Sequence, residues 1–126
     1  MKLSVMLFPY HPGLVAGTVT PEAIAADLRA GGASAVEAMV SFAQSHPQHW
    51  AALLEAIGEA GLQHACLDIG VNLACSTAPE RQAALDTVKH GLDTAAALDC
   101  PVVLLAGSRP PEGMSNEEGR RWYGEN

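Results

Sequence analysis

The sequence is short of basic residues, aromatic residues, cysteines and long apolar runs, and these shortages exclude several classes of protein. Seven Lys and Arg stand against 14 Asp and Glu, which gives a net charge of -7. The basic residues are scattered along the chain, which argues against a surface that follows nucleic-acid phosphates. We therefore expect no nucleic-acid partner.

The sequence also lacks the features of a membrane or secreted protein. Its apolar stretches fall short of the roughly 20 residues that a membrane helix needs. The stretch at residues 3–8 follows a single Lys and stops at Pro9, so it is too short for a secretory signal. The three cysteines form no CxxC pair and fit reduced structural thiols. We expect a cytoplasmic protein without a membrane partner.

What the sequence does contain is a regular alternation of apolar segments. Hydrophobic residues make up 48% of the chain and charged residues 17%, as is typical of a folded globular domain. Four short apolar segments predict strands, at residues 3–8, 35–41, 64–71 and 102–106. Apolar residues at helical spacing predict a helix between each pair of strands. This order is typical of βαβ units with a parallel sheet.

Each predicted helix begins at a capping signal. Thr20 precedes Pro21, as an N-cap precedes a first-turn proline. Ser45–Gln48 and Thr77–Glu80 both have the form of a capping box. The helix after Thr77 carries its apolar residues at helical spacing, and we expect this face to pack against the sheet. The residues of this face are Leu85, Val88, Leu92 and Ala96.

The end of the chain departs from this regular pattern. Ser115–Glu118 is a further capping box and begins a fourth helix, which has barely two turns before Asn126. A parallel sheet whose last strand lacks its helix leaves an apolar face bare. We therefore expect residues 1–126 to be a single partial domain, the amino-terminal part of a longer one. A small natural domain with a short last helix is the alternative.

Several segments, in order, resemble the xylose isomerase-like TIM barrels, a superfamily that includes sugar-phosphate isomerases and epimerases. These segments are AVEAM, GLQHACLDIG, ERQAALDTVKHGLDTAAALDCPVVLLAGS and PPEGMSNEEGRRW. The third segment is the most specific, although Asp99-Cys100 stands where a Leu-Gly pair is usual. The resemblance covers the whole chain. It implies the first half of an α/β barrel of parallel (β/α) units: four strands, three full helices and the start of a fourth.

The resemblance also implies a chemistry. Members that isomerise or epimerise sugars bind a divalent metal, Mn²⁺, Mg²⁺, Co²⁺ or Zn²⁺, through acidic and histidine ligands in the second half of the barrel. The implied reaction is proton transfer beside a carbonyl of a small sugar or keto acid. Because no residue here matches those ligands, we expect the metal in the full-length barrel, none bound by this chain alone, and no activity of this half by itself.

Two alternatives remain open. The chain could be a non-catalytic half-barrel that dimerises, or pairs with another chain, to close its sheet. The third hypothesis is a DNA-repair nuclease of the endonuclease IV type, which places metal histidines on strands of the first half. We disfavour it because the third and fourth predicted strands end without histidine and the chain is acidic.

Five residues near the predicted strand ends are candidates for substrate binding: Tyr10, His11, Glu37, Asn72 and Arg109. Glu37 lies in an apolar strand and matches the Glu of the family's second strand. It either contacts substrate in the barrel lumen or pairs with a basic group there, because an isolated buried charge is costly. Tyr10 and His11 follow the first strand, and either shape a sugar pocket or belong to an ordinary surface loop.

The other two candidates follow later strands. Asn72 either binds a substrate hydroxyl or, as we favour, satisfies backbone groups of its own turn. Arg109 is the one basic residue in the strand-end loops, so it either binds a carboxylate or phosphate or is a plain surface arginine. The remaining histidines, including His46, lie in or beside predicted helices, or at a strand start. We expect them to be solvated or to cap helix ends.

Overall fold

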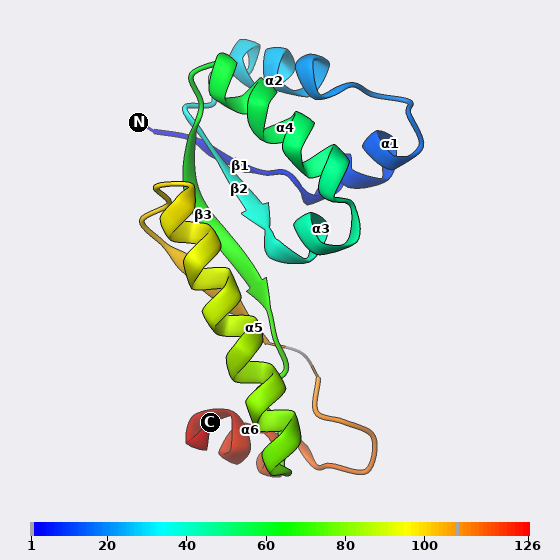
Figure 1. Ribbon diagram of the computed structural model, residues 1–126, viewed down its shortest axis with the longest axis vertical. Coiled ribbons are helices and arrows are strands. Elements are labelled where there is room, and N and C mark those ends of the chain that lie inside the picture. Colours follow the sequence, from blue (N-terminus) through cyan, green and yellow to red (C-terminus); the bar gives the residue numbers. More distant parts are fainter. Residues whose placement is uncertain (1, 108) are drawn as a thin grey trace.

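The sheet of this protein is parallel and open. The computed structural model describes residues 2–107 and 109–126. Its strands are β1 (Ser4–Met6), β2 (Ala35–Met39), β3 (Gln63–Gly70) and β4 (Val103–Ala106). They pair in the order β1-β2-β3-β4, with β1 and β4 as the two edges (Figure 1). The predicted parallel α/β architecture is confirmed, whereas the described residues do not close a barrel.

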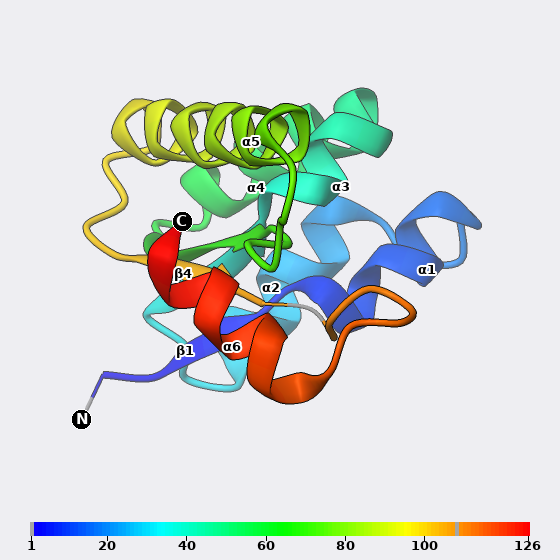
Figure 2. The same cartoon turned by 90° about the horizontal axis from the view of Figure 1, so that it is seen from below.

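Helices follow each strand. The described residues form η1 (Phe8–Tyr10), α1 (His11–Val15), α2 (Pro21–Ala30), α3 (Val40–Ser45), α4 (Pro47–Glu59), α5 (Ala78–Ala97) and α6 (Asn116–Glu125). The three predicted full helices correspond to α2, α4 and α5, and the predicted fourth to α6. In the view of Figure 2, α5 lies above β4 and α6 lies below it. The short helices η1, α1 and α3 are additions that the sequence patterns did not predict.

The first strand is shorter than predicted, and the loop expected after it is helical. Pro9 and Pro12 occupy first-turn positions of η1 and α1. There the missing N–H of proline costs no hydrogen bond, and its fixed φ suits a helix. Proline also marks turns, and for that reason we expected a loop. The consequence is that Tyr10 and His11 are held in helical turns.

The second strand is also shorter than predicted, and the capping box expected at Ser45 is wrong. β2 ends at Met39, and Val40 begins α3. Ser45 is the last residue of α3, and its hydroxyl donates to the Ser41 carbonyl at 2.8 Å. α4 starts after His46, which makes no side-chain cap. A short apolar run cannot be assigned to strand or helix from periodicity alone, which explains the error.

The other three predicted helix starts have the expected geometry. Thr20 Oγ1 accepts a hydrogen bond from the Ala23 N–H at 3.2 Å. The Glu80 carboxylate accepts from the N–H of Thr77 at 3.1 Å and from its hydroxyl at 2.7 Å. At the start of α6, Ser115 Oγ accepts from the Glu118 N–H at 3.2 Å. All three predictions hold because a cap depends on residues within one turn of each other.

The long helices α2, α4 and α5 pack on one face of the sheet. Val36 of β2 and Leu67 and Ile69 of β3 are fully buried on this face. The helices contribute further buried residues to the same core, among them Ile24, Leu28, Leu53 and Ile57. α5 approaches closely at Gly91, where an added Cβ would lie 2.6 Å from the Ile69 Cγ1. The core therefore lies between the sheet and α2, α4 and α5.

The predicted apolar face of α5 is wrong for three of its four residues. Leu85 is 41% exposed, Leu92 is 47% exposed, and Ala96 is exposed. Val88 alone is half-buried, in a small cluster beside the main core. The buried residues of α5 are Ala84, Gly91 and Ala95. Small residues let the helix backbone lie close to Ile69, and the larger leucines, one position further round the helix, turn outward.

The expectations about membrane helices and about the cysteines can be compared with the described residues. The helices found there are too short or too polar to cross a membrane. The cysteines are free thiols, with Cys75 and Cys100 buried and Cys66 half-buried. These thiols contribute to packing in the way that small hydrophobic residues do.

Candidate functional site

The face of the sheet opposite α2, α4 and α5 carries polar residues on three adjacent strands, and we call it the opposite face. Ser4, Glu37, Cys66 and Asp68 lie on it, because side chains alternate along a strand and their neighbours are in the core. A register shift after Val36 places Glu37 beside Cys66. Asp68 is the next residue of β3 on the same face.

Glu37 has a hydroxyl partner. Ser4 Oγ donates to Glu37 Oε1 at 2.5 Å, across the β1–β2 pair. Hydrogen bonds to an ionised carboxylate are shorter and stronger than neutral ones. The basic partner that we considered for Glu37 is not found among the described residues, whose one ion pair joins Arg121 and Glu125. Glu37 is therefore oriented by Ser4 and is half-buried on the opposite face.

Asp68 is a site residue that the sequence analysis missed. It is 4% exposed, the one charged side chain buried among the described residues. Burial, followed by the negative charge of Glu37, raises the pKa of the Asp68 carboxyl. The signal was present in the sequence as the alternation of Cys66, Asp68 and Gly70 with Leu67 and Ile69. The sequence analysis did not assign the residues of this strand to two separate faces.

Cys66 lies between the two carboxylates. Its thiol donates to Asp68 Oδ1 at 3.8 Å, which lowers the pKa of Asp68 by less than burial raises it. Burial, then Asp68 and Glu37, raise the pKa of the Cys66 thiol. Cys66 is therefore a neutral donor at pH 7 rather than a nucleophile. Two neighbouring carboxylates in different surroundings are the arrangement that separates a proton donor from a proton acceptor.

A groove of about 640 Å³ lies at the carboxyl ends of β1 and β2, between α1 and α3. On its wall, His11 stacks on Phe42 with ring centroids 3.7 Å apart and planes 8° from parallel. His46 also stacks on Phe42, at 5.2 Å. Met39 lines the groove and pairs with Asp68 in the sheet, so the groove opens beside the opposite face. Ligands of parallel α/β folds bind at this end of the strands.

His11 is unusual within this groove. Its Nε2 is buried without a hydrogen-bond partner in the described part of the chain. Burial, followed by the nearby His46, lowers the pKa of His11, so the ring is neutral at pH 7. A neutral imidazole has one donor and one acceptor nitrogen. His46, which we expected to be solvated or capping, instead forms part of the groove because α3 and the start of α4 fold against α1.

The other predicted residues do not join this site. Tyr10 is half-buried and packs against the main core. Asn72 Oδ1 accepts from the Ala74 N–H at 3.0 Å, which is the local role that we favoured. Arg109 is exposed. Within residues 2–107 and 109–126, no hydrogen bond or ion pair links Asn72 or Arg109 to Glu37 or His11.

Two of the candidate residues from the sequence lie next to residues that the sequence analysis did not select. His11 lies against Phe42 and His46, and Glu37 lies beside Asp68. Phe42 and His46 were missed because α3 was not predicted: residues 40–41 were assigned to a strand, and Ser45 to a capping box. The candidate site therefore consists of the carboxylates of the opposite face and the groove next to them.

The metal expected for a complete barrel does not fit these residues alone. In the described residues, no group of three or more His, Cys, Asp and Glu side chains is arranged to hold a metal ion. Glu37 and Asp68 supply two carboxylates, and Cys66 stays protonated.

The comparisons with known proteins give no family for this chain. A scan against protein-family models gives no match, and a search of curated proteins finds no significant relative. The resemblance to the xylose isomerase-like barrels therefore rests on the sequence segments alone.

Proposed function

We propose that this chain forms half of a (β/α) barrel that binds a small, sugar-like molecule and takes part in proton transfer on it. The observation that carries the proposal is the position of Glu37 and Asp68 on the same face of adjacent parallel strands. In a closed barrel this face lines the lumen, which ligands reach from the carboxyl ends of the strands. The resemblance to sugar isomerases and epimerases supports the same reading.

The two carboxylates suit this chemistry. Isomerisation or epimerisation needs one group that removes a proton beside a carbonyl and one that returns it. Asp68, with its raised pKa, is suited to hold the proton. Glu37, oriented by the Ser4 hydroxyl, is suited to bind a substrate hydroxyl beside it. Cys66 stays neutral between them.

The groove supports a sugar-like ligand rather than a charged one. The half-buried ring of His11, backed by the buried Phe42, lies on the groove wall and suits contact with the C–H face of a sugar. Ser41 and Ser45 supply hydroxyls at the groove. A mostly apolar pocket with a few polar groups is typical of small-molecule sites.

The first test measures binding and proton exchange. Two-dimensional NMR of the chain would be recorded with a panel of aldoses, ketoses and their phosphates, with shifts expected at His11, Met39 and Phe42. Proton transfer would be followed as the incorporation of deuterium from D₂O into the sugar. The assay would contain added Mn²⁺ or Mg²⁺ and either this chain or the longest product of its gene. Loss of a general acid or base costs about 10²–10⁴-fold. We expect that loss in Asp68→Asn, and weaker ligand shifts in Glu37→Gln, which loses the carboxylate that binds the substrate hydroxyl.

The matched control is Asp93→Asn, which changes an exposed carboxylate of α5. It should leave both ligand shifts and deuterium uptake as they are in the parent chain. Absence of shifts and of deuterium uptake across the whole panel would overturn the proposal.

The non-catalytic half-barrel is the second candidate, and exposed leucines of β4 favour it. Leu104 is 49% exposed and Leu105 38% exposed, on opposite faces of the strand. Side chains of this kind are usually covered by a partner. Under this alternative, Glu37 and Asp68 are structural and the sugar panel gives no shifts.

A further inference from the structure

β4 is an edge strand, and its outward main-chain groups follow from its bonds to β3. The carbonyls of Val102 and Ala106 accept from β3 at 3.0 and 3.2 Å. Main-chain groups of successive residues in a strand point to alternate sides. The N–H and C=O groups of Val103 and Leu105 therefore point to the free edge.

α6 covers part of this edge. The Tyr123 hydroxyl donates to the Leu105 carbonyl at 3.3 Å, in the place that the N–H of a fifth strand would take. An added Cβ on Gly107 would lie 3.1 Å from the Tyr123 ring, so the ring lies directly on the strand end. The helix is held further by Asn126, whose Nδ2 donates to two carbonyls of the 73–75 segment, at 3.0 and 2.9 Å.

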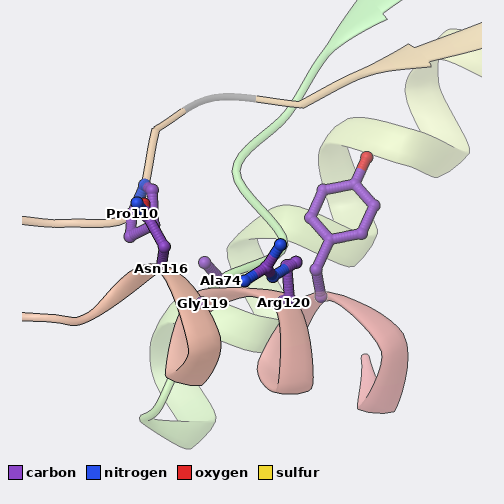
Figure 3. A pocket seen from close by; sticks show the side chains of 6 residues that line it. Ala74, Pro110, Asn116, Gly119 and Arg120 are labelled. Atoms are coloured by element: carbon purple, nitrogen blue, oxygen red, sulfur yellow. The ribbon is translucent and has the colours of Figure 1, made fainter.

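The rest of α6 is only partly buried. Gly119 is the one buried residue of this helix, and an added Cβ there would lie 2.6 Å from the Pro110 Cγ. Tyr123 packs beside a small cluster of Val71, Leu73, Cys75 and Ala84. A cleft of about 260 Å³ lies between the helix and the preceding segments, and its lining residues are Ala74, Pro110, Asn116, Gly119, Arg120 and Tyr123 (Figure 3). Elements with few buried apolar contacts open at a low free-energy cost. The three hydrogen bonds of Tyr123 and Asn126 add to this limited packing in holding α6 in place.

The β1 edge, at the other side of the sheet, also has main-chain groups that are free to pair with a strand. The Leu3 carbonyl and the Leu7 N–H bond to the β2 side, so Ser4 and Met6 present their main-chain groups outward. Leu3 is 44% exposed and Phe8 52% exposed, so this edge also has apolar side chains beside it. A twofold axis along the strands would set β4 of each copy parallel to β1 of the other. Such a pair leaves no free edge.

We propose that α6 is a displaceable cover over the β4 edge, and that its release lets β4 pair with β1 of a second copy of this chain. Two outward residues on β4, Val103 and Leu105, meet two on β1, Ser4 and Met6. This inference is independent of the proposed proton transfer, because it uses neither Glu37 nor Asp68.

The test weakens the attachment of α6 by removing the hydrogen bonds of its side chains. The double variant Tyr123→Phe/Asn126→Ala loses the three hydrogen bonds that tie α6 to β4 and to the 73–75 segment. Sedimentation velocity from low to several hundred micromolar should show a mainly monomeric parent chain, and dimerisation tightened by roughly tenfold or more in the variant, as the loss of three hydrogen bonds of ordinary strength gives. Hydrogen exchange should show new protection of the amides of Ser4, Met6, Val103 and Leu105. Glu117→Gln, an exposed change on α6, is the control and should stay monomeric.

A further change shows whether the edge itself pairs. Leu105→Pro, added to the double variant, removes an outward N–H, and proline is tolerated in an edge strand. It should restore the monomer while circular dichroism stays unchanged. Leu104→Lys, which places a charge beside the edge, is the second disruptor if Leu105→Pro impairs folding.

Three results would overturn the proposal. These are a double variant that stays monomeric, a dimer that both disruptors leave intact, and a parent chain that already dimerises through β4 with α6 in place.

Discussion

At the scale of single residues, Asp68 combines burial with a neighbouring negative charge. Both effects disfavour its ionised form, and both raise the pKa of the carboxyl. The folded state therefore holds the Asp68 proton more tightly than the unfolded state does. The consequence for stability is a cost that appears as the pH rises and Asp68 ionises.

We predict that Asp68→Asn stabilises the protein at neutral pH. An asparagine cannot ionise, so it avoids the cost of the buried charge. The melting temperature should rise by roughly 3–5 °C at pH 7, which is about what 1 kcal/mol yields in a domain of this size. The gain should shrink as the pH falls and vanish below about 4, the ordinary pKa of an aspartate, because Asp68 is then protonated in both the folded and the unfolded state. Thermal melts across this pH range measure it.

Asp93→Asn serves as the matched control for this prediction, since Asp93 is exposed on α5. It should change the melting temperature little at any pH. An Asp68→Asn protein that is less stable than the parent at pH 7 would mean that the carboxylate makes a favourable contact that asparagine cannot replace.

At the scale of elements, α5 is positioned by its smallest residue. Gly91 lies in the middle of a 20-residue helix, where glycine costs about 1 kcal/mol relative to alanine. That cost is offset because the backbone can lie against Ile69 of β3. The same close approach turns Leu85 and Leu92 toward the outside.

We predict that Gly91→Ala destabilises the protein, although alanine is the better helix former. The new Cβ would meet Ile69, and overpacking of this kind costs about 1–3 kcal/mol. Gly58→Ala is the matched control in α4, because the space around Gly58 is open. It should stabilise by up to about 1 kcal/mol. Denaturant unfolding of both variants measures the difference, and equal gains in both would show that α5 does not depend on the close approach.

At the scale of the whole molecule, apolar side chains are exposed on α5 and around β4, next to the free edge of the sheet. The main core, in contrast, lies between the sheet and α2, α4 and α5. Residues of the same type therefore differ in their contribution to stability according to which side of the molecule they occupy.

We predict that Leu92→Gln changes the free energy of unfolding by less than about 0.5 kcal/mol, as surface substitutions do. Leu53→Ala, a change at a fully buried position of α4, should cost about 2–5 kcal/mol. Urea unfolding monitored by circular dichroism measures both. A large loss from Leu92→Gln would mean that this face of α5 is covered in solution.

The sequence by itself determined the order of the main elements and the parallel α/β class. Periodicity predicted the four strands and the helices α2, α4 and α5, and local capping signals at Thr20, Thr77 and Ser115 predicted three helix starts. These features depend on residues within one or two turns of each other. Where two local patterns compete, as in the prolines before α1 and the apolar run before α3, the sequence did not resolve them.

Only the tertiary structure decided which side chains meet. The hydrogen bond of Ser4 to Glu37, the proximity of Glu37 to Asp68, the stack of His11 on Phe42, and the contact of Tyr123 with β4 join segments that are between 18 and 33 residues apart. The face of α5 was decided in the same way, by how closely Gly91 could approach Ile69. Such contacts depend on the register of the strands and on how closely backbones approach, and neither is fixed by a residue's own neighbours in the chain.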